Sequence, residues 1–276
     1  MCIRDSIGLC HEIKSMNRQL PDLMETEMQN IEFRAAGLNH LSILLEARYK
    51  NTGKDGYPII KQNFDAYFSD LVNKHDAKPS KPGAERGVFR KLFKTYGYLP
   101  ITTDSHLGEY IQWAYSVADH DAILDFYDNY KKKCLAFYDN KTSYDHYFDL
   151  KNLDTHERVV PIIEGILSDS AYEEPAINIP NNGYIECLPK DIVVEVPGII
   201  NKSGISGISF KNYPAAFGSL LNSQSGVIQM TTDAVLNASK HSAYLALLAD
   251  PVVNDSYQAE KLLNLSLIHI SEPTRP

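Results

Sequence analysis

Two short motifs place a cysteine and a histidine in similar glycine-led surroundings. The first, GLCH, covers residues 8–11, and the second, GLNH, covers residues 37–40. Cysteine sulfur and histidine nitrogen are the side-chain atoms that bind divalent transition metals most readily at neutral pH. Two protein ligands leave several coordination positions open, and an open metal site is more often catalytic than structural. Cys10 and His40 therefore form a candidate metal site, and a small buried thiol and a core histidine are the alternatives.

The second motif lies where two β-rich segments meet. Residues 29–39 and 41–49 have the composition of strands, and they are joined at Asn39-His40 beside a glycine. Side chains at the end of a strand, next to a turn, commonly project into a cleft. The sequence therefore predicts that this turn presents His40 to a ligand.

The remaining segments predict an α+β fold. Apolar spacing predicts helices over 57–71 and 85–96, from Ser105 or His106 to Val117, and over 154–167, where Pro161 should kink or start the apolar part. Residues 119–150 predict a surface helix or lobe, and 213–248 predict two helices. Strands are predicted at 176–180 and 191–200, a turn at 181–183 and a loop at 78–83. The segments lack the rhythm of βαβ units.

Composition excludes several classes of protein. The formal net charge is −8, and no basic stripe is present, which argues against nucleic-acid binding. No run of eighteen apolar residues is present, so no membrane span is expected. Apart from Cys2, the cysteines are Cys10, Cys134 and Cys187, an odd and scattered set that is no disulfide framework and fits a reducing cytoplasm.

The two ends of the chain have an unusual relationship. A DNA segment that encodes residues 1–6 has a complementary strand that encodes Leu-Ser-Leu-Ile and the start of a histidine codon, as found from Leu265 onward. This pattern is typical of a sequencing adapter that has been translated. We therefore predict that residues 1–6 and 265–276 are adapter-derived and that residues 7–264 are one genuine domain, cut from a longer gene.

Four motifs together carry a family resemblance. They are GLCHE at 8–12, AGLNHL at 36–41, TDSHLGEY at 103–110 and NIPNNGYIECLPKDIVVEVPGII at 178–200. In order and spacing, residues 7–264 resemble the C-terminal domain of glycoside hydrolase family 4. The resemblance implies a fold like the C-terminal domain of lactate and malate dehydrogenases, with a mixed or antiparallel sheet. It also implies a parent enzyme with an N-terminal Rossmann domain that this chain lacks.

The activity implied by the resemblance is hydrolysis of α-glycosides with NAD and Mn²⁺ as cofactors. NAD⁺ takes a hydride from C3 of the sugar, and the resulting ketone acidifies the proton at C2. A base removes that proton, the C1 oxygen leaves, water adds and C3 is reduced again. Family 4 is thus an exception to hydrolysis by two carboxylates. The GLCH motif resembles the branch that acts on unphosphorylated α-galactosides and α-galacturonides, without separating galactoside, glucoside and uronide substrates.

The resemblance also implies roles for single residues. Cys10 and His40 match the metal ligands, and Asp104 matches the base that removes the C2 proton, with a helix N-cap as its alternative. Asn39 could orient a sugar hydroxyl or shape the turn, and His11 could contact the substrate or begin a helix. The lesser candidates for the base are Tyr96, Tyr98 and Tyr110, and those for lining the pocket are His106 and Glu109.

No residue of this chain is expected to bind the nucleotide. Residues 204–207, GISG, are too short for a dinucleotide fingerprint. The expected partners are a small carbohydrate and further copies of the chain in a dimer or tetramer, in the cytoplasm. Two alternatives remain: a C-terminal domain of a lactate- or malate-type dehydrogenase, whose active site would not need Cys10, and a non-catalytic metal-binding or oligomerisation domain.

Overall fold

The computed structural model describes residues 8–9, 13–74, 86–118, 120–139 and 158–271. The strands are β1 (Ile31–Leu38), β2 (Leu41–Tyr49), β3 (Tyr172–Pro180), β4 (Val193–Asn201) and β5 (Gly204–Gly207). The helices are α1 (Lys14–Met24), α2 (Tyr57–Lys74), α3 (Gly87–Tyr96), α4 (Asp104–Leu107), α5 (His120–Asp139), α7 (Val159–Ser168), α8 (Ala215–Leu236), α9 (Lys240–Ala249) and α10 (Ser256–Ser271). Short 3-10 turns, η1 and η2, cover Met28–Asn30 and Gln112–Ser116.

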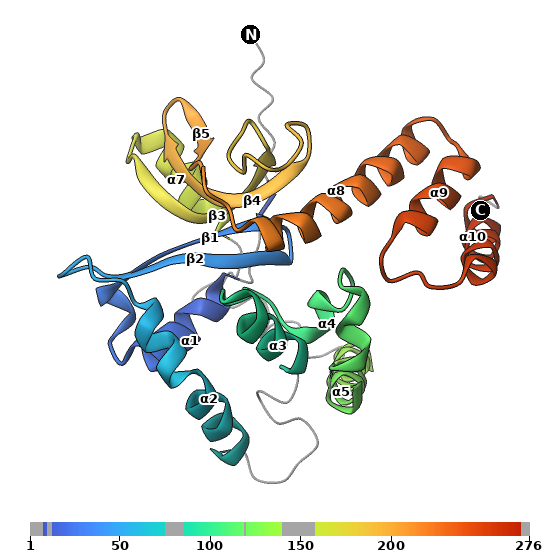
Figure 1. Ribbon diagram of the computed structural model, residues 1–276. Coiled ribbons are helices and arrows are strands. Elements are labelled where there is room, and N and C mark those ends of the chain that lie inside the picture. The colour runs from blue at the N-terminus through green and yellow to red at the C-terminus, as the bar shows by residue number, and fades with distance from the viewer. Residues whose placement is uncertain (1–7, 10–12, 75–85, 119, 140–157, 272–276) are drawn as a thin grey trace.

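One antiparallel sheet organises the molecule. Its strand order is β2-β1-β4-β3, and β5 pairs with β4. Helices α1, α2 and α3 gather beside β1 and β2, whereas α7 packs against β4 (Figure 1). The predicted α+β class is therefore confirmed, and the pairing between the named strands is antiparallel rather than mixed.

The β1–β2 hairpin is closed by the two residues Asn39 and His40, since Leu38 pairs with Leu41. His40 has a φ of +58°, in the left-handed region that a tight hairpin turn requires. A Cβ atom on Gly37 would lie 2.4 Å from the Leu41 carbonyl oxygen. Glycine is therefore the residue that lets the two strands approach at the base of the turn.

The core lies between this hairpin and the first helices. The buried side chains Met16 and Leu20 of α1, Phe64 and Phe68 of α2 and Phe89 of α3 belong to one cluster with β1 and β2. The rings of Phe64 and Phe68 lie 4.8 Å apart between centroids. Replacing one such phenylalanine by alanine typically costs about 3–5 kcal/mol, so this cluster holds the hairpin and its turn in place.

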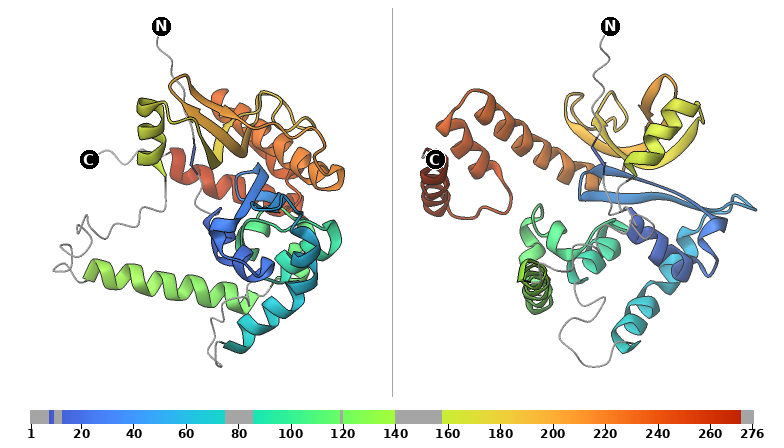
Figure 2. Two further views of the ribbon diagram at one scale, coloured as in Figure 1. Left: turned by 90° about the vertical axis from the view of Figure 1, so that its left-hand side faces the viewer. Right: turned by 180° about the vertical axis from the view of Figure 1, so that it is seen from behind.

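The last three helices extend away from the sheet. Helix α8 runs outward from β4, and α9 and α10 fold back at its far end (Figures 1 and 2). The prediction of two helices over 213–248 is confirmed, and the Ser239 side chain caps α9 by accepting the Ser242 N–H. Helix α10 was not predicted, and it crosses the proposed boundary at residue 264.

One local prediction is wrong. The single helix predicted up to Val117 is instead the one-turn helix α4 followed by the 3-10 turn η2. Gly108, a poor helix former, ends α4. The segment 204–207, which is too short for a dinucleotide fingerprint, forms the strand β5 and pairs with β4. No described helix has both the length and the apolar character needed to cross a membrane.

Candidate functional site

The centre of the candidate site is a contact between two histidines. His40, on the β1–β2 turn, and His106, on α4, have ring centroids 4.2 Å apart. His106 Nδ1 is buried without a hydrogen-bond partner and lies 3.4 Å from a carboxylate oxygen of Glu109. This contact brings the TDSHLGEY motif next to the GLNH motif, so that residues of both motifs can contribute to one site.

A buried carboxylate underlies the turn that carries His40. Glu195 of β4 has an exposed fraction of 2%. The Ser42 hydroxyl donates a hydrogen bond of 2.8 Å to one of its oxygens, and the Asn39 amide nitrogen lies 3.5 Å from the other. Strand β4 thus contacts the turn through side chains that precede and follow His40 in the sequence.

Glu195 belongs to a row of residues that crosses the sheet. Gly8 pairs with Asn178, Asn178 with Glu195, Glu195 with Gly37, and Gly37 with Ser42. Residues directly opposite in antiparallel strands have side chains on the same face. The row therefore connects the GLCH segment, through β3 and β4, to the hairpin that presents His40.

Tyr110 is the tyrosine candidate that lies at the turn. Its hydroxyl donates to the Asn39 carbonyl oxygen over 3.5 Å. Burial, together with Glu109 and Glu195, raises the pKa of Tyr110 above its ordinary value. Of the other two tyrosine candidates, Tyr96 packs against Phe217 and Tyr98 packs against Tyr57.

Asp104, the first residue of α4, is buried, and its carboxylate lies at the start of α3. Its two carboxylate oxygens accept the backbone N–H groups of Val88 and Phe89, each at 2.9 Å. Asp104 therefore caps α3. The sequence predicted capping as the alternative to a role as base, but at the helix that Asp104 itself begins. Burial raises the pKa of Asp104, although the two N–H groups and the charge of Arg86 oppose that shift.

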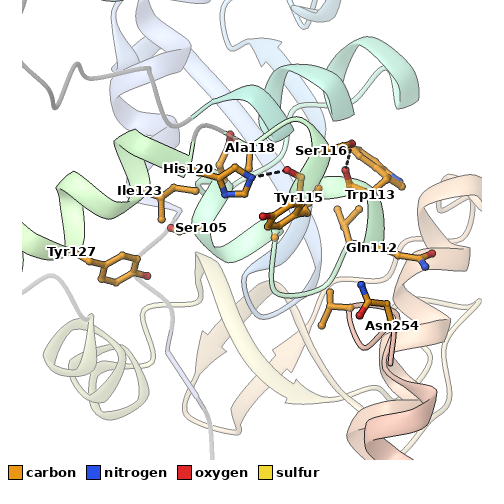
Figure 3. Close-up of a pocket in the computed structure, with 15 residues that line it drawn as sticks. Ser105, Gln112, Trp113, Tyr115, Ser116, Ala118, His120, Ile123, Tyr127 and Asn254 are labelled. Atoms are coloured by element: carbon orange, nitrogen blue, oxygen red, sulfur yellow. Dashed lines mark hydrogen bonds between the residues drawn. The ribbon is translucent and has the colours of Figure 1, made fainter. Parts of the chain in front are cut away.

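A cavity of about 570 Å³ opens beside Asp104. Figure 3 shows Trp113, Tyr115, His120 and Tyr127 around it, together with Asn254 from the loop between α9 and α10. Helix α4 contributes to both places, since Asp104 and Ser105 line the cavity while His106 contacts His40. The cavity lies next to the histidine pair but does not include it.

The donor chemistry of the turn fits a divalent cation. His40, on the β1–β2 turn, offers an imidazole nitrogen of the kind that binds divalent transition metals. Cys10 and His11 lie outside the described residues, so only the His40 half of the predicted pair has a described position. Within the described ranges, no group of three or more His, Cys, Asp or Glu side chains could hold a metal ion.

The sequence reading missed Glu195 and Ser42. The available signal was the glutamate inside the otherwise apolar run VVEVPGII. A charged residue is almost never fully buried unless it has a partner, so its place inside a predicted strand marks a specific contact. By contrast, Asn181 has a structural role in the predicted turn, since its amide nitrogen donates hydrogen bonds to the carbonyl oxygens of Ile185 and Leu188.

Comparison with known proteins decides the family. Residues 35–253 match the profile of the family 4 glycosyl hydrolase C-terminal domain. The chain belongs to glycoside hydrolase family 4. This membership confirms the family resemblance, and it favours a glycosidase domain over a lactate- or malate-type dehydrogenase.

The curated family 4 relatives are α-glycosidases. An α-glucosidase of Erwinia rhapontici is 38% identical over 95% of this chain and 61% of its own length. An α-galactosidase of Bacillus subtilis is 27% identical over 94% of this chain and 58% of its own. An α-galacturonidase of Thermoanaerobacterium saccharolyticum is 26% identical over 94% and 58%. The chain therefore spans about three fifths of each of these relatives.

Solved family 4 structures share the fold. The lplD protein of Bacillus subtilis superposes with a TM-score of 0.74 at 22% identity, covering 94% of this chain and 62% of that one. A 6-phospho-α-glucosidase from gut microorganisms, solved with NAD and Mn²⁺, has a TM-score of 0.72 at 17% identity, covering 98% and 61%. At these identities the likeness establishes the fold alone.

Proposed function

We propose that this chain is the catalytic and substrate-binding domain of an α-glycosidase that depends on NAD and Mn²⁺. The observation that carries the proposal is the His40 turn, which rests on buried Glu195 and faces His106 within a family 4 domain. Cys10 and His40 are the proposed metal ligands. His11 and Asn39 are the proposed contacts to substrate.

The two cofactors would supply reversible oxidation at C3 and polarisation of the oxygen there, which acidifies the neighbouring C–H bond. The work of this chain is to orient the sugar and to accept its C2 proton. Asp104 is the proposed base because it matches the base of the family within the TDSHLGEY motif and lines the cavity beside the His40 turn. Tyr110 is the alternative, because its hydroxyl lies at the Asn39 turn.

The proposed substrate is a neutral α-glucoside, with α-galactoside next. The identity to the Erwinia α-glucosidase supports glucose. Among the described residues, those that line the cavity beside Asp104 include aromatic and neutral polar side chains together with His120, and none of them is Lys or Arg. A sugar phosphate or a uronide carries a negative charge that such a cation would recognise, so this lining favours an uncharged sugar.

The binding site for NAD would lie outside this chain, in an N-terminal Rossmann domain, with residues 7–264 as the domain described here. We also propose a cytoplasmic enzyme that assembles from several copies. Large apolar side chains on the surface of α5 support the assembly, among them Phe126, Tyr130 and Tyr138, which are 46%, 60% and 67% exposed. A non-catalytic metal-binding or oligomerisation domain is the second candidate.

A chimera tests the proposal. Residues 7–264 are joined behind the N-terminal part of the Erwinia α-glucosidase, and release of p-nitrophenol is followed from α-glucoside, α-galactoside and α-galacturonide substrates. We expect the α-glucoside to be cleaved fastest, and only when both NAD⁺ and Mn²⁺ are present. Cleavage without NAD⁺ would contradict the mechanism, and a folded chimera that cleaves none of the three would favour the non-catalytic alternative.

A further inference from the structure

We propose that Glu195 is a positioning residue that fixes the Asn39-His40 turn in the geometry that binds the metal ion. The inference rests on the proposed metal site and adds to it a residue that does not itself touch the metal. Glu195 would act through its hydrogen bonds to the residues on either side of His40.

The first observation is where Glu195 lies. It is a glutamate of β4 with an exposed fraction of 2%, between the buried residues Val194 and Val196. Taking a carboxylate out of water costs several kcal/mol unless hydrogen bonds or opposite charge offset the loss. A glutamate in this strand is thus a costly choice for packing alone, and its contacts must account for it.

The second observation is what Glu195 holds. Ser42 donates to Glu195 Oε1 at 2.8 Å, and the Asn39 amide nitrogen lies 3.5 Å from Oε2. Asn39 directly precedes His40, and Ser42 follows it by two residues. One carboxylate therefore ties both arms of the turn to β4. His40 itself has a φ of +58°, in the left-handed region, so the backbone of the turn has a defined geometry that these contacts support.

The third observation extends the same support toward the other proposed ligand. Asn178 faces Glu195 across β3 and β4, and it exchanges two backbone hydrogen bonds of 2.9 Å with Gly8, two residues before Cys10. Both polar atoms of its carboxamide are buried without a partner. A Cβ on Gly8 would lie 3.0 Å from Asn178 Cβ, so the strand and the GLCH segment are in close contact. A single polar row therefore underlies both motifs.

The expected effect of Glu195 is on metal affinity. Residues that orient metal ligands from behind typically contribute 10–100-fold to metal affinity. We expect a loss of this size when Glu195 is replaced, without loss of the sheet.

The test is titration of the full chain with Mn²⁺ alone, followed by the electron paramagnetic resonance signal of the free ion. Glu195→Gln keeps the size of the side chain but removes its negative charge and replaces one of its two acceptor oxygens by a donor. We expect its dissociation constant for Mn²⁺ to rise at least tenfold. The control is Glu174→Gln, since Glu174 is equally buried at 2% but is bound by Arg158 at the other end of β3. The control should bind Mn²⁺ as the unchanged chain does.

The outcomes separate this inference from the metal site itself. If the unchanged chain binds no Mn²⁺, or if Cys10→Ser and His40→Ala bind Mn²⁺ as tightly as the unchanged chain does, the metal site is wrong and the role of Glu195 is wrong with it. If those two variants lose binding while Glu195→Gln keeps it within twofold, the positioning role alone is overturned. Should Glu195→Gln fail to fold by circular dichroism, Ser42→Ala decides: at least threefold weaker binding supports the role, and unchanged binding overturns it.

Discussion

The imidazole rings of His40 and His106 lie 4.2 Å apart, although one belongs to a hairpin turn and the other to a short helix. This contact joins two of the four motifs that identify the family. It makes the β1–β2 turn, rather than the large cavity, the centre of the candidate site. The two places share helix α4, so a sugar in the cavity would lie beside the histidine pair.

The first prediction concerns the metal ligands. In an enzyme completed with a Rossmann domain, Cys10→Ser and His40→Ala should each abolish the activity that depends on Mn²⁺, because each removes a proposed ligand. The fold should persist, since His40 is only partly buried. Activity is measured across a range of Mn²⁺ concentrations and folding by circular dichroism. An unchanged dependence on Mn²⁺ in both variants would refute the assignment.

The second prediction concerns the stability that Asp104 gives to α3. In Asp104→Asn, an amide group replaces one carboxylate oxygen and faces a backbone N–H of Val88 or Phe89, leaving a buried donor unpaired. We expect the free energy of unfolding to fall by about 1–3 kcal/mol. Urea denaturation of both proteins measures the difference. A variant as stable as the unchanged chain would show that the cap contributes little.

The third prediction follows from the pKa of Asp104, which burial raises. The folded protein then holds this proton more tightly than the unfolded chain. The associated stability is present below the ordinary aspartate pKa of about 3.9, and it is lost as the pH rises through the folded value. Relative to Asp104→Asn, the unchanged chain should therefore lose stability as the pH is raised above about 4. An advantage that instead grows with pH would mean that the pKa is lowered.

The fourth prediction separates the two candidate bases. In the completed enzyme, losing the base should lower turnover by about 10²–10⁴-fold. We expect this loss in Asp104→Asn and a smaller one in Tyr110→Phe, which removes only the hydroxyl beside Asn39. The comparison is of kcat at saturating substrate. The reverse order would transfer the role to Tyr110.

The fifth prediction concerns the two ends. Deleting residues 1–6 and 265–276 should lower the free energy of unfolding by less than about 1 kcal/mol, the size of a typical damaging substitution. Leu265, where the second deletion starts, is 60% exposed on α10. Thermal melts of the trimmed and full chains test this. A larger loss would mean that the ends pack and are not adapter-derived.

Sequence reasoning succeeded where the signal is local. The β1–β2 hairpin followed from two strand-like segments around a glycine-led turn, and both strands end within two residues of the predicted bounds. The break between α8 and α9 was also predicted. Helix α10 was missed because residues 265–276 were set aside as adapter-derived, so no helical pattern was sought across the boundary.

Sequence reasoning failed where a contact spans distant segments. Asp104 caps α3 rather than α4, because the chain between them folds back to bring its carboxylate to Val88. Glu195 contacts Ser42 because β4 pairs with β1, and no residue spacing in the sequence predicts that pairing. The candidate ligands were named by family motifs, whereas the residues that support them were found only in the fold.

The most direct test of the proposed activity is the fate of the proton at C2. The completed enzyme is run in deuterated water on an α-glucoside, and the released sugar is analysed by proton nuclear magnetic resonance. Oxidation at C3 followed by elimination requires this proton to leave and a solvent proton to replace it. We predict deuterium at C2 of the product made by the unchanged enzyme. In Asp104→Asn, both turnover and the incorporation of deuterium should be lost. A product that retains its original C2 proton would contradict the account.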